Sequence, residues 1–318
     1  MKAFLLYPDR DLDLDAGLPP EEPDLTRDLG LDTLFDAMAD GDTFIRDVAQ
    51  RVMLASLTEP EEIVYRQSVL GDCLTHPDAV RELYAIAVDT INGERRVFGS
   101  FLRSPDSILR RSTDVLDLFV EMLHRLRKIG DDHAADFHSA GFTRFFEMLA
   151  EELDDTYFKR VQDHLGRLKF KSGVLVSASL GQGCNGTGYV LRRPHPRRRW
   201  RDRLTGTAPP SYTYRIPDRD EAGAQALSEL RGQGLNLAAD ALARSADHIL
   251  SFFTMLRREL GFYIGCLNLH EQLTAKGEPV CFPDPLPAGR PVLSCRSLHD
   301  ICLALRRDGR VAASAWPS

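Results

Sequence analysis

The sequence has no apolar run that approaches the roughly 18 residues of a membrane-spanning helix. Its opening, MKAFLLYPDRDLD, places only a short apolar stretch before acidic residues, a pattern that fits neither a signal peptide nor a membrane anchor. Cysteine is also scarce, because six residues scattered over 318 positions are too few for a disulfide framework. We therefore expect reduced thiols and a cytoplasmic protein with no membrane partner.

The composition lacks the extremes that mark disordered, collagen-like or disulfide-stapled chains. Hydrophobic residues make up 43% and charged residues 27% of the 318 positions, which is the range of ordinary globular proteins. A chain of this length can bury a substantial core. It is long enough for two domains, or for a single elongated one.

Charge is distributed unevenly along the chain. The formal net charge is −7, yet the first 40 residues alone carry eleven acidic and three basic side chains. That leaves the remaining 278 residues at about +1, so the total charge says little about partners. Within this near-neutral remainder one short segment is strongly basic, at Arg192, Arg193, Arg197, Arg198, Arg199, Arg201 and Arg203.

Helix starts can be read from the local sequence after residue 31. Asp42 or Thr43 is placed to cap one helix, and Pro60 and Pro105 each stand beside acidic residues in the manner of a first helical turn. Apolar residues recur with a helical period between and after these starts. The pattern predicts a helical block over residues 31–169.

The period changes near residue 170. Residues 174–180 and 189–191 are typical of short strands joined by a glycine-rich turn, and residues 212–216 predict a third strand. These segments predict a small β insertion that interrupts the helices.

Helical spacing returns after Pro217 and persists through residues 235–273. These 39 residues would span roughly 58 Å as one helix. Such a helix is longer than a compact domain needs, which favours a long connecting helix in an elongated molecule. Gly261 or Gly265 could divide it into two helices.

The sequence therefore predicts five parts. The first 30 residues, with prolines among acids, are expected to form an extended arm that has no core of its own. The parts in order are the acidic N-terminal arm 1–30, the first half of the helical core 31–169, the β insertion with its basic loop 170–217, the long returning helix 218–275 and the start of a further domain 276–318.

A glycine pattern within the β insertion imitates a nucleotide-binding loop. Residues 181–186 match G-x-G-x-x-G and follow a predicted strand. A dinucleotide-binding loop must open a helix, whereas here the sequence leads through a second apolar stretch to Pro194 and Pro196. A glycine hairpin is therefore the favoured interpretation.

Two groups of possible metal ligands are weak for similar reasons of spacing. His133 and His138 would lie about 140° apart on a helix, so they could not share one ion. Cys295, His299 and Cys302 have better spacing, but no C-x-x-C knuckle accompanies them. We expect no metal site, and a Cys/His metal enzyme remains a minor alternative.

The basic segment is the strongest local signal for a partner. Clustered guanidinium groups repel one another unless phosphates or carboxylates neutralise them, and Trp200 adds a face for stacking. Double-stranded DNA is one expected partner of these arginines. The alternative is that the acidic N-terminal arm neutralises their charge within the chain. The candidate DNA-binding residues are Arg192, Arg193, Arg197, Arg198, Arg199, Trp200, Arg201 and Arg203.

The order of a helical block, a β interruption and a long returning helix resembles the core and lever region of the MutS family of DNA mismatch-repair ATPases. Residues 34–57 and 65–70 resemble the family's early core helices, and residues 259–269, ELGFYIGCLNL, resemble the end of its lever. Residues 290–311 stand where the first strands of the ATPase domain would lie. The resemblance extends over about residues 30–310.

The resemblance implies a mainly α, elongated core and lever bundle with a small β insertion and the beginning of a C-terminal α/β ATPase-like domain. It also implies ATP and Mg²⁺ as cofactors of full-length relatives. This sequence, however, contains no G-x-x-x-x-G-K-[ST] motif to hold phosphates, so we expect no cofactor in this chain and no catalysis by it alone. Its final residues would fit a chain truncated before the P-loop.

Two functions from different classes remain open on this evidence. The first is a DNA-binding MutS-related fragment, whose partners would include duplex DNA and either a second copy or an ATPase-bearing chain. The second is a helical scaffold that binds other proteins and no DNA. Strongly salt-dependent DNA binding would distinguish the first from the second.

Overall fold

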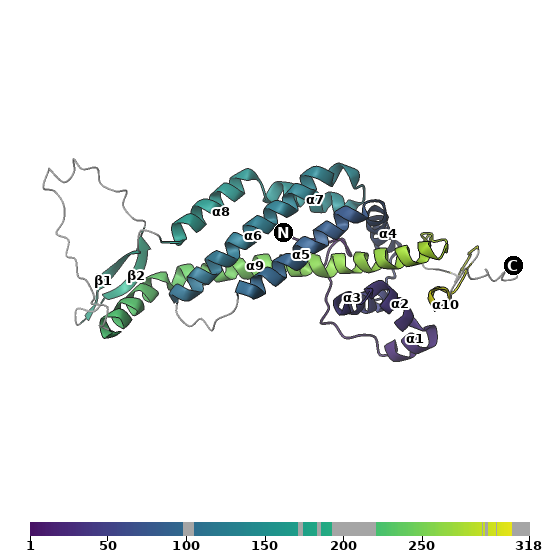
Figure 1. Cartoon of the computed structure of the whole chain (residues 1–318), viewed down its shortest axis with the longest axis horizontal. Helices are drawn as coiled ribbons and strands as arrows, with labels where there is room; N and C mark the ends of the chain where they lie inside the picture. The colour runs from purple at the N-terminus through teal and green to yellow at the C-terminus, as the bar shows by residue number, and fades with distance from the viewer. Residues whose placement is uncertain are drawn as a thin grey trace. The chain divides into compact units, whose positions relative to one another are not determined.

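A computed structural model describes most of the chain, and within the described residues it contains ten α-helices, one 3₁₀ helix and one two-stranded sheet (Figure 1). The predicted mainly α fold with a small β insertion is confirmed. The described residues are 1–97, 105–170, 174–182, 186–192, 221–287, 289, 292–296 and 298–306.

The chain divides into two compact units. Unit 1 comprises residues 1–93, 121–157 and 250–318, and unit 2 comprises residues 94–120 and 158–249. Three helices, α5 (Pro77–Val97), α6 (Pro105–His133) and α9 (Glu221–Ala275), contribute residues to both units. Helix α8 (Asp155–Leu168) has its first three residues in unit 1 and the rest in unit 2. The remaining elements of unit 1 are α1 (Glu22–Leu29), α2 (Leu31–Ala39), α3 (Thr43–Leu54), α4 (Pro60–Thr75), η1 (Ala134–Asp136), α7 (Ala140–Glu152) and α10 (Ile301–Arg306).

The helix starts follow the local signals of the sequence. Asp42 is the residue that caps α3, and its Oδ1 accepts hydrogen bonds from the backbone N–H groups of Phe44 at 2.8 Å and Ile45 at 3.3 Å. Helices α4 and α6 begin at Pro60 and Pro105, where the missing proline N–H removes no helical hydrogen bond. These predicted starts are confirmed.

The N-terminal arm has a packed, non-helical first part and a helical last part. Its first 14 residues, here called the N-terminal strap, pack within unit 1, where Leu5 and Leu6 are fully buried. The buried Tyr263 hydroxyl donates to the Leu5 carbonyl at 2.6 Å, and the Glu259 Oε2 atom accepts from the Leu5 N–H at 2.6 Å. Further along, residues Glu22–Leu29 form α1, whose first turn holds a proline and acidic side chains that favour a helix N-terminus.

Helix α9 continues through Gly261 and Gly265, so the division considered at these glycines does not occur. A Cβ atom on Gly265 would lie 3.2 Å from the Met38 Cε and 3.3 Å from the Ile45 Cγ2. The glycine thus lets α9 approach α2 and α3 closely. Close packing of backbones, rather than a break, accounts for glycine at this position.

The family resemblance implies strands after α9, in a segment of which residues 288, 290–291, 297 and 307–318 lie outside the described part of the chain. Among the described residues of 276–306 there is no strand, and Ile301–Arg306 forms the short helix α10. The Asp300 Oδ1 atom caps this helix by accepting from the Leu303 N–H at 3.0 Å. Helix α10 packs on α2, where the Arg306 Nε donates to the Thr33 Oγ1 at 2.9 Å.

Unit 2 places a small sheet against the first half of α9. The strands are β1 (Leu175–Leu180) and β2 (Gly186–Arg192). Their core partners are Leu109 of α6 with Leu235 and Ala239 of α9, which are all buried. None of the described helices is long and apolar enough to cross a lipid bilayer.

Candidate nucleic-acid interface

The glycine pattern lies in a β-hairpin, as the sequence predicts. Strands β1 and β2 pair antiparallel, with Val176 opposite Leu191 and Ser177 opposite Val190, and with an irregularity after Ser177. Residues 183–185 of the glycine pattern lie outside the described part of the chain. Gly186, the last glycine of the pattern, begins strand β2, whereas a dinucleotide-binding loop leads into a helix.

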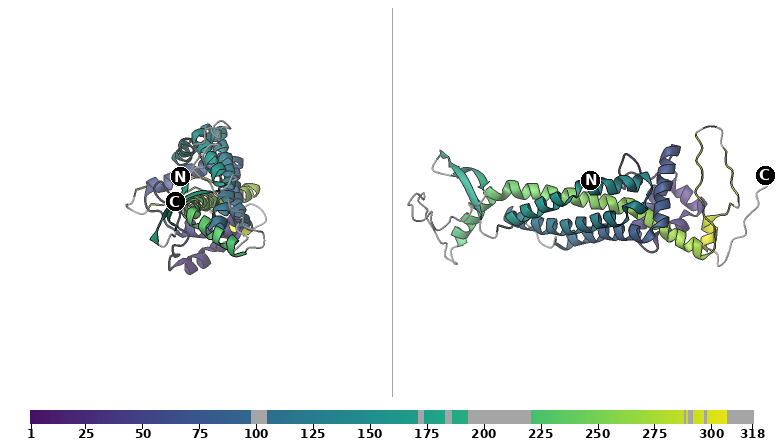
Figure 2. Two further views of the ribbon diagram at one scale, coloured as in Figure 1. Left: turned by 90° about the vertical axis from the view of Figure 1, so that its left-hand side faces the viewer. Right: turned by 90° about the horizontal axis from the view of Figure 1, so that it is seen from above.

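One face of the hairpin packs against α9. A Cβ atom on Gly234 would lie 2.6 Å from the Val176 Cγ2 atom, so only glycine permits this approach without a shift of the strand. Val174 and Leu191 pack against the buried cluster of Leu109, Leu235 and Ala239. Figures 1 and 2 show the hairpin beside the first turns of α9.

The other face of the hairpin points to solvent, since successive side chains of a strand alternate between faces. Leu175 is 38% exposed and Val190 is 48% exposed, although both are apolar. The same face carries Ser177 and Arg192. This outer face therefore combines apolar contact area with one cationic and one hydroxyl group.

Arg192 is the last residue of β2, and its side chain is exposed. Its Nε donates to the Ser177 Oγ at 2.9 Å, which holds the side chain along the strand pair. This bond uses one of the five N–H donors of the guanidinium. The other predicted DNA-binding residues lie outside the described residues: Arg193, Arg197, Arg198, Arg199, Trp200, Arg201 and Arg203.

A polar groove beside the hairpin was not expected from the sequence. It encloses about 670 Å³ between Tyr189 of β2, Pro105 of α6 and the first turns of α9. Gln225, Gln233 and Asn236 line it, and their helical spacing is the signal that could have revealed a shared amide-rich face. Amide groups both donate and accept hydrogen bonds, as the edges of nucleobases do.

The possible metal ligands do not assemble. The His133 Nδ1 atom lies 3.3 Å from Asp136, whereas the His138 backbone N–H donates to the buried Asp72. Cys302 is buried and Cys295 is exposed. Across the described ranges, no three or more His, Cys, Asp or Glu side chains are arranged to hold a metal ion.

A family model described as the MutS2 N-terminal domain matches residues 58–276. The match begins just before α4, ends one residue after α9 and includes the hairpin. No curated protein matches the sequence. No solved structure matches it either. Because the family model covers well over half of the sequence, the chain belongs to the MutS2 N-terminal domain family.

Proposed function

We propose that this chain is a MutS-related, DNA-binding core and lever region that contacts the DNA backbone through the outer face of its hairpin and the basic segment that follows. The observation that carries the proposal is the position of Arg192. Its exposed side chain lies at the end of β2, where the chain continues into the arginine-rich segment. A two-stranded ribbon is narrow enough to enter the major groove of duplex DNA.

The proposed contacts are electrostatic and do not read sequence. Arginines that neutralise phosphates release condensed counterions, so the logarithm of the affinity falls with the logarithm of the salt concentration by about 0.9 per phosphate contacted. The exposed Leu175 and Val190 would add apolar contact to the sugars of the DNA backbone. Placement of this binding in DNA mismatch repair, and in the cytoplasm, belongs to the same proposal and is supported by the family resemblance.

The proposal includes no ATP hydrolysis by this chain. The 318-residue sequence contains no Walker A motif, whose backbone amides and lysine would hold the β- and γ-phosphates. Any ATPase activity would come from a partner chain or a longer relative. Magnesium-dependent ATP turnover by the purified chain, above that of a mock purification, would contradict this part.

The test compares the salt dependence of duplex binding for the unmodified chain, a triple variant of the basic segment and a control triple variant. Arg197→Ala, Arg198→Ala and Arg199→Ala together should flatten the log–log salt slope by about two to three. A control triple variant in unit 1 removes the same charge from exposed side chains that pair with acids elsewhere, at Arg27, Arg81 and Arg125. An unchanged slope in the first variant, or an equal change in the control, would contradict the proposal.

Neutralisation of the basic segment by the acidic arm is tested by substitution. Deletion of the arm is unsuitable because Leu5 and Leu6 are fully buried in unit 1. Asp13→Asn, Asp15→Asn and Glu21→Gln change exposed side chains only. If the arm competes with DNA, this triple variant binds duplex more tightly, whereas the DNA proposal without competition expects less than a threefold change.

A second candidate function, a helical scaffold, is favoured by one separate observation. The first half of α9 exposes three leucines at helical spacing, with Leu227 at 56%, Leu230 at 47% and Leu237 at 80% exposure. An exposed apolar stripe of this kind is typical of a helix that meets another protein, either a second copy or an ATPase-bearing chain. Leu237→Lys should abolish concentration-dependent self-association in sedimentation experiments if a second copy is the partner.

A further inference from the structure

The N-terminal strap is attached to unit 1 through one fully buried carboxyl group, that of Glu259 on α9. The Glu259 Oε2 atom accepts a hydrogen bond from the Leu5 N–H at 2.6 Å, and the N–H groups of Leu6 and Leu12 interact with the same carboxyl group. All three leucines are buried. Glu259 therefore connects the beginning and the end of the packed part of the strap to α9.

Other bonds hold the strap without involving a carboxyl group. The Tyr65 hydroxyl of α4 donates to the Phe4 carbonyl at 2.6 Å, and the Arg144 Nη1 of α7 donates to the Pro8 carbonyl at 2.8 Å. Neither bond requires a group that changes its charge near neutral pH, because an arginine stays protonated and burial raises the pKa of the Tyr65 hydroxyl. These two bonds are therefore independent of pH in the neutral range.

Two buried carboxyl oxygens beside the strap have no donor. The Glu259 Oε1 and Asp11 Oδ1 atoms lack a hydrogen-bond partner among the described residues. Asp11 directly precedes Leu12, which interacts with Glu259, and the other oxygen of Asp11 is bound by the Lys2 ammonium group. Buried acceptors without a donor are costly, and a proton on Glu259 would turn one of these acceptors into a donor.

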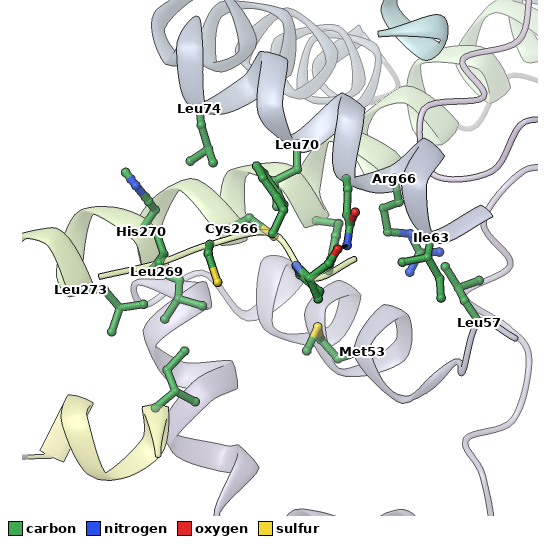
Figure 3. A pocket seen from close by; sticks show the side chains of 17 residues that line it. Met53, Leu57, Ile63, Arg66, Leu70, Leu74, Cys266, Leu269, His270 and Leu273 are labelled. Atoms are coloured by element: carbon green, nitrogen blue, oxygen red, sulfur yellow. Dashed lines mark hydrogen bonds between the residues drawn. The ribbon is translucent and has the colours of Figure 1, made fainter. Parts of the chain in front are cut away.

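The charged and titratable groups of α4 and α9 near the strap do not supply that donor. Burial raises the pKa of the Tyr263 hydroxyl, so this group keeps its proton, which it donates to the strap. Arg66 of α4 lies at the apolar pocket drawn in Figure 3, and its guanidinium carbon is 4.9 Å from the centre of the Tyr7 ring of the strap. Arg66 therefore stacks on the strap, and among the described residues no cation is bonded to the free oxygen of Glu259.

We propose that Glu259 and Asp11 form a proton-operated latch, in which a proton on Glu259 keeps the strap closed and loss of that proton releases the strap from α9. Loss of the proton places two negative charges in a buried site, where they repel more strongly than in water. The pKa of Glu259, which is raised to about 7 mainly by burial, sets the release near neutral pH. The latch is independent of the DNA-binding proposal, since both carboxyl groups belong to unit 1 and the hairpin belongs to unit 2.

The test is amide hydrogen exchange of the full chain at pH 6 and pH 8, measured by mass spectrometry and corrected for the intrinsic pH dependence of exchange. The equilibrium constant for strap opening should be roughly tenfold larger at pH 8, because opening lowers the pKa of Glu259 from about 7 towards 4.5. The strap should also be protected at least about tenfold less than residues 250–258 of α9, since it opens without unfolding of unit 1.

Three variants assign the effect to the latch. Glu259→Gln removes the ionisation, so its strap should exchange equally at both pH values to within about twofold. Asp11→Asn removes the repelling charge, which lowers the pKa of Glu259 and should make the change between pH 6 and pH 8 smaller. Glu152→Gln is the matched control, because Glu152 also holds the strap, through the Met1 amino group at 3.1 Å, and this variant should keep the full change.

Three results would overturn the proposal. The first is equal opening of the strap at pH 6 and pH 8 in the unmodified chain. The second is a pH effect of the same size in Glu259→Gln or, if that variant does not fold, in Asp11→Asn. The third is equal protection of the strap and of residues 250–258 at both pH values, which would mean that the strap leaves α9 only when unit 1 unfolds.

Discussion

The two halves of α9 share one continuous helix but have opposite surroundings. In residues 250–275, which belong to unit 1, Phe253, Leu256 and Leu260 are fully buried. In residues 221–249, which belong to unit 2, most side chains are exposed, and Leu237 is 80% exposed. The same helix is therefore a buried core element in unit 1 and is largely exposed to solvent in unit 2.

We infer that the residues most important for stability and those proposed to bind DNA lie in different parts of the chain. Burial of large side chains contributes most of the free energy of folding, so unit 1 has the more densely packed part of this helix. The hairpin of unit 2 has one packed face and one solvated face, which leaves residues such as Arg192 available for a partner. We expect substitutions in the first region to change stability and substitutions in the second to change binding.

The largest expected effect is the loss of a buried aromatic ring from the second half of α9. Phe253→Ala should lower the free energy of unfolding by about 3–5 kcal/mol, because it leaves a cavity in a packed core. Leu237→Ala removes an exposed side chain from the first half and should change it by no more than about 0.5 kcal/mol. Urea denaturation of both variants measures the contrast, and equal effects would contradict it.

The next effect concerns the carboxyl group of Glu259, which is fully buried on the same helix. Its pKa is raised from 4.5 to about 7, mainly by burial and also by the charge of Asp11, against the lowering effect of backbone hydrogen bonds from the N-terminal strap. The Glu259 Oε1 and Asp11 Oδ1 atoms have no hydrogen-bond partner among the described atoms.

A raised pKa in the folded state means that the folded protein holds this proton more tightly than the unfolded chain does. The associated stability is full below the unfolded value of 4.5 and is lost as the pH rises through about 7. A rise in pKa from 4.5 to about 7 corresponds to a decrease of about 3 kcal/mol in the free energy of unfolding between acidic pH and pH 8. Glu259→Gln removes the ionisation and should be more stable than the unmodified protein at pH 8.

The measurement is urea denaturation at pH 5, 6.5 and 8. Glu271→Gln is the matched control, because Glu271 lies on the same helix with its side chain 61% exposed. A similar pH dependence in the unmodified protein and in Glu259→Gln would show that this carboxyl group does not titrate as described.

The smallest expected effect is at Gly234, where α9 meets the hairpin. An alanine Cβ would lie 2.6 Å from the Val176 Cγ2 atom, so Gly234→Ala should displace β1 and reduce protection of the hairpin amides in hydrogen exchange. The better helix propensity of alanine offsets part of this, so the net loss of stability should be about 1 kcal/mol.

Two companion variants sharpen this test. Addition of Val176→Ala should restore hairpin protection, because it removes the atoms that clash. Gly232→Ala, whose Cβ would lie at an ordinary 3.5 Å from Pro105, should leave protection unchanged. If Gly234→Ala alone preserves hairpin protection, close packing does not hold β1 against α9.

The sequence by itself determined the features that depend on neighbouring residues. Asp42 caps α3 through N–H groups two and three positions later, and Pro60 starts α4 because proline suits a first turn. The hairpin follows equally from local alternation and glycine. The basic segment could be identified by composition, although of its arginines only Arg192 lies among the described residues.

Only the tertiary structure decided the features that join distant parts of the chain. The strap is held at Leu5 by Glu259 and Tyr263, which lie 254 and 258 positions away, and no local pattern encodes such a pairing. The same reason applies to Gly265. Its sequence context allows a break in the helix, and only the packing of Met38 against this position shows why a glycine is there. Side chains acquire partners, burial and shifted pKa values only when the chain packs, because these properties depend on distance in space rather than on separation in sequence.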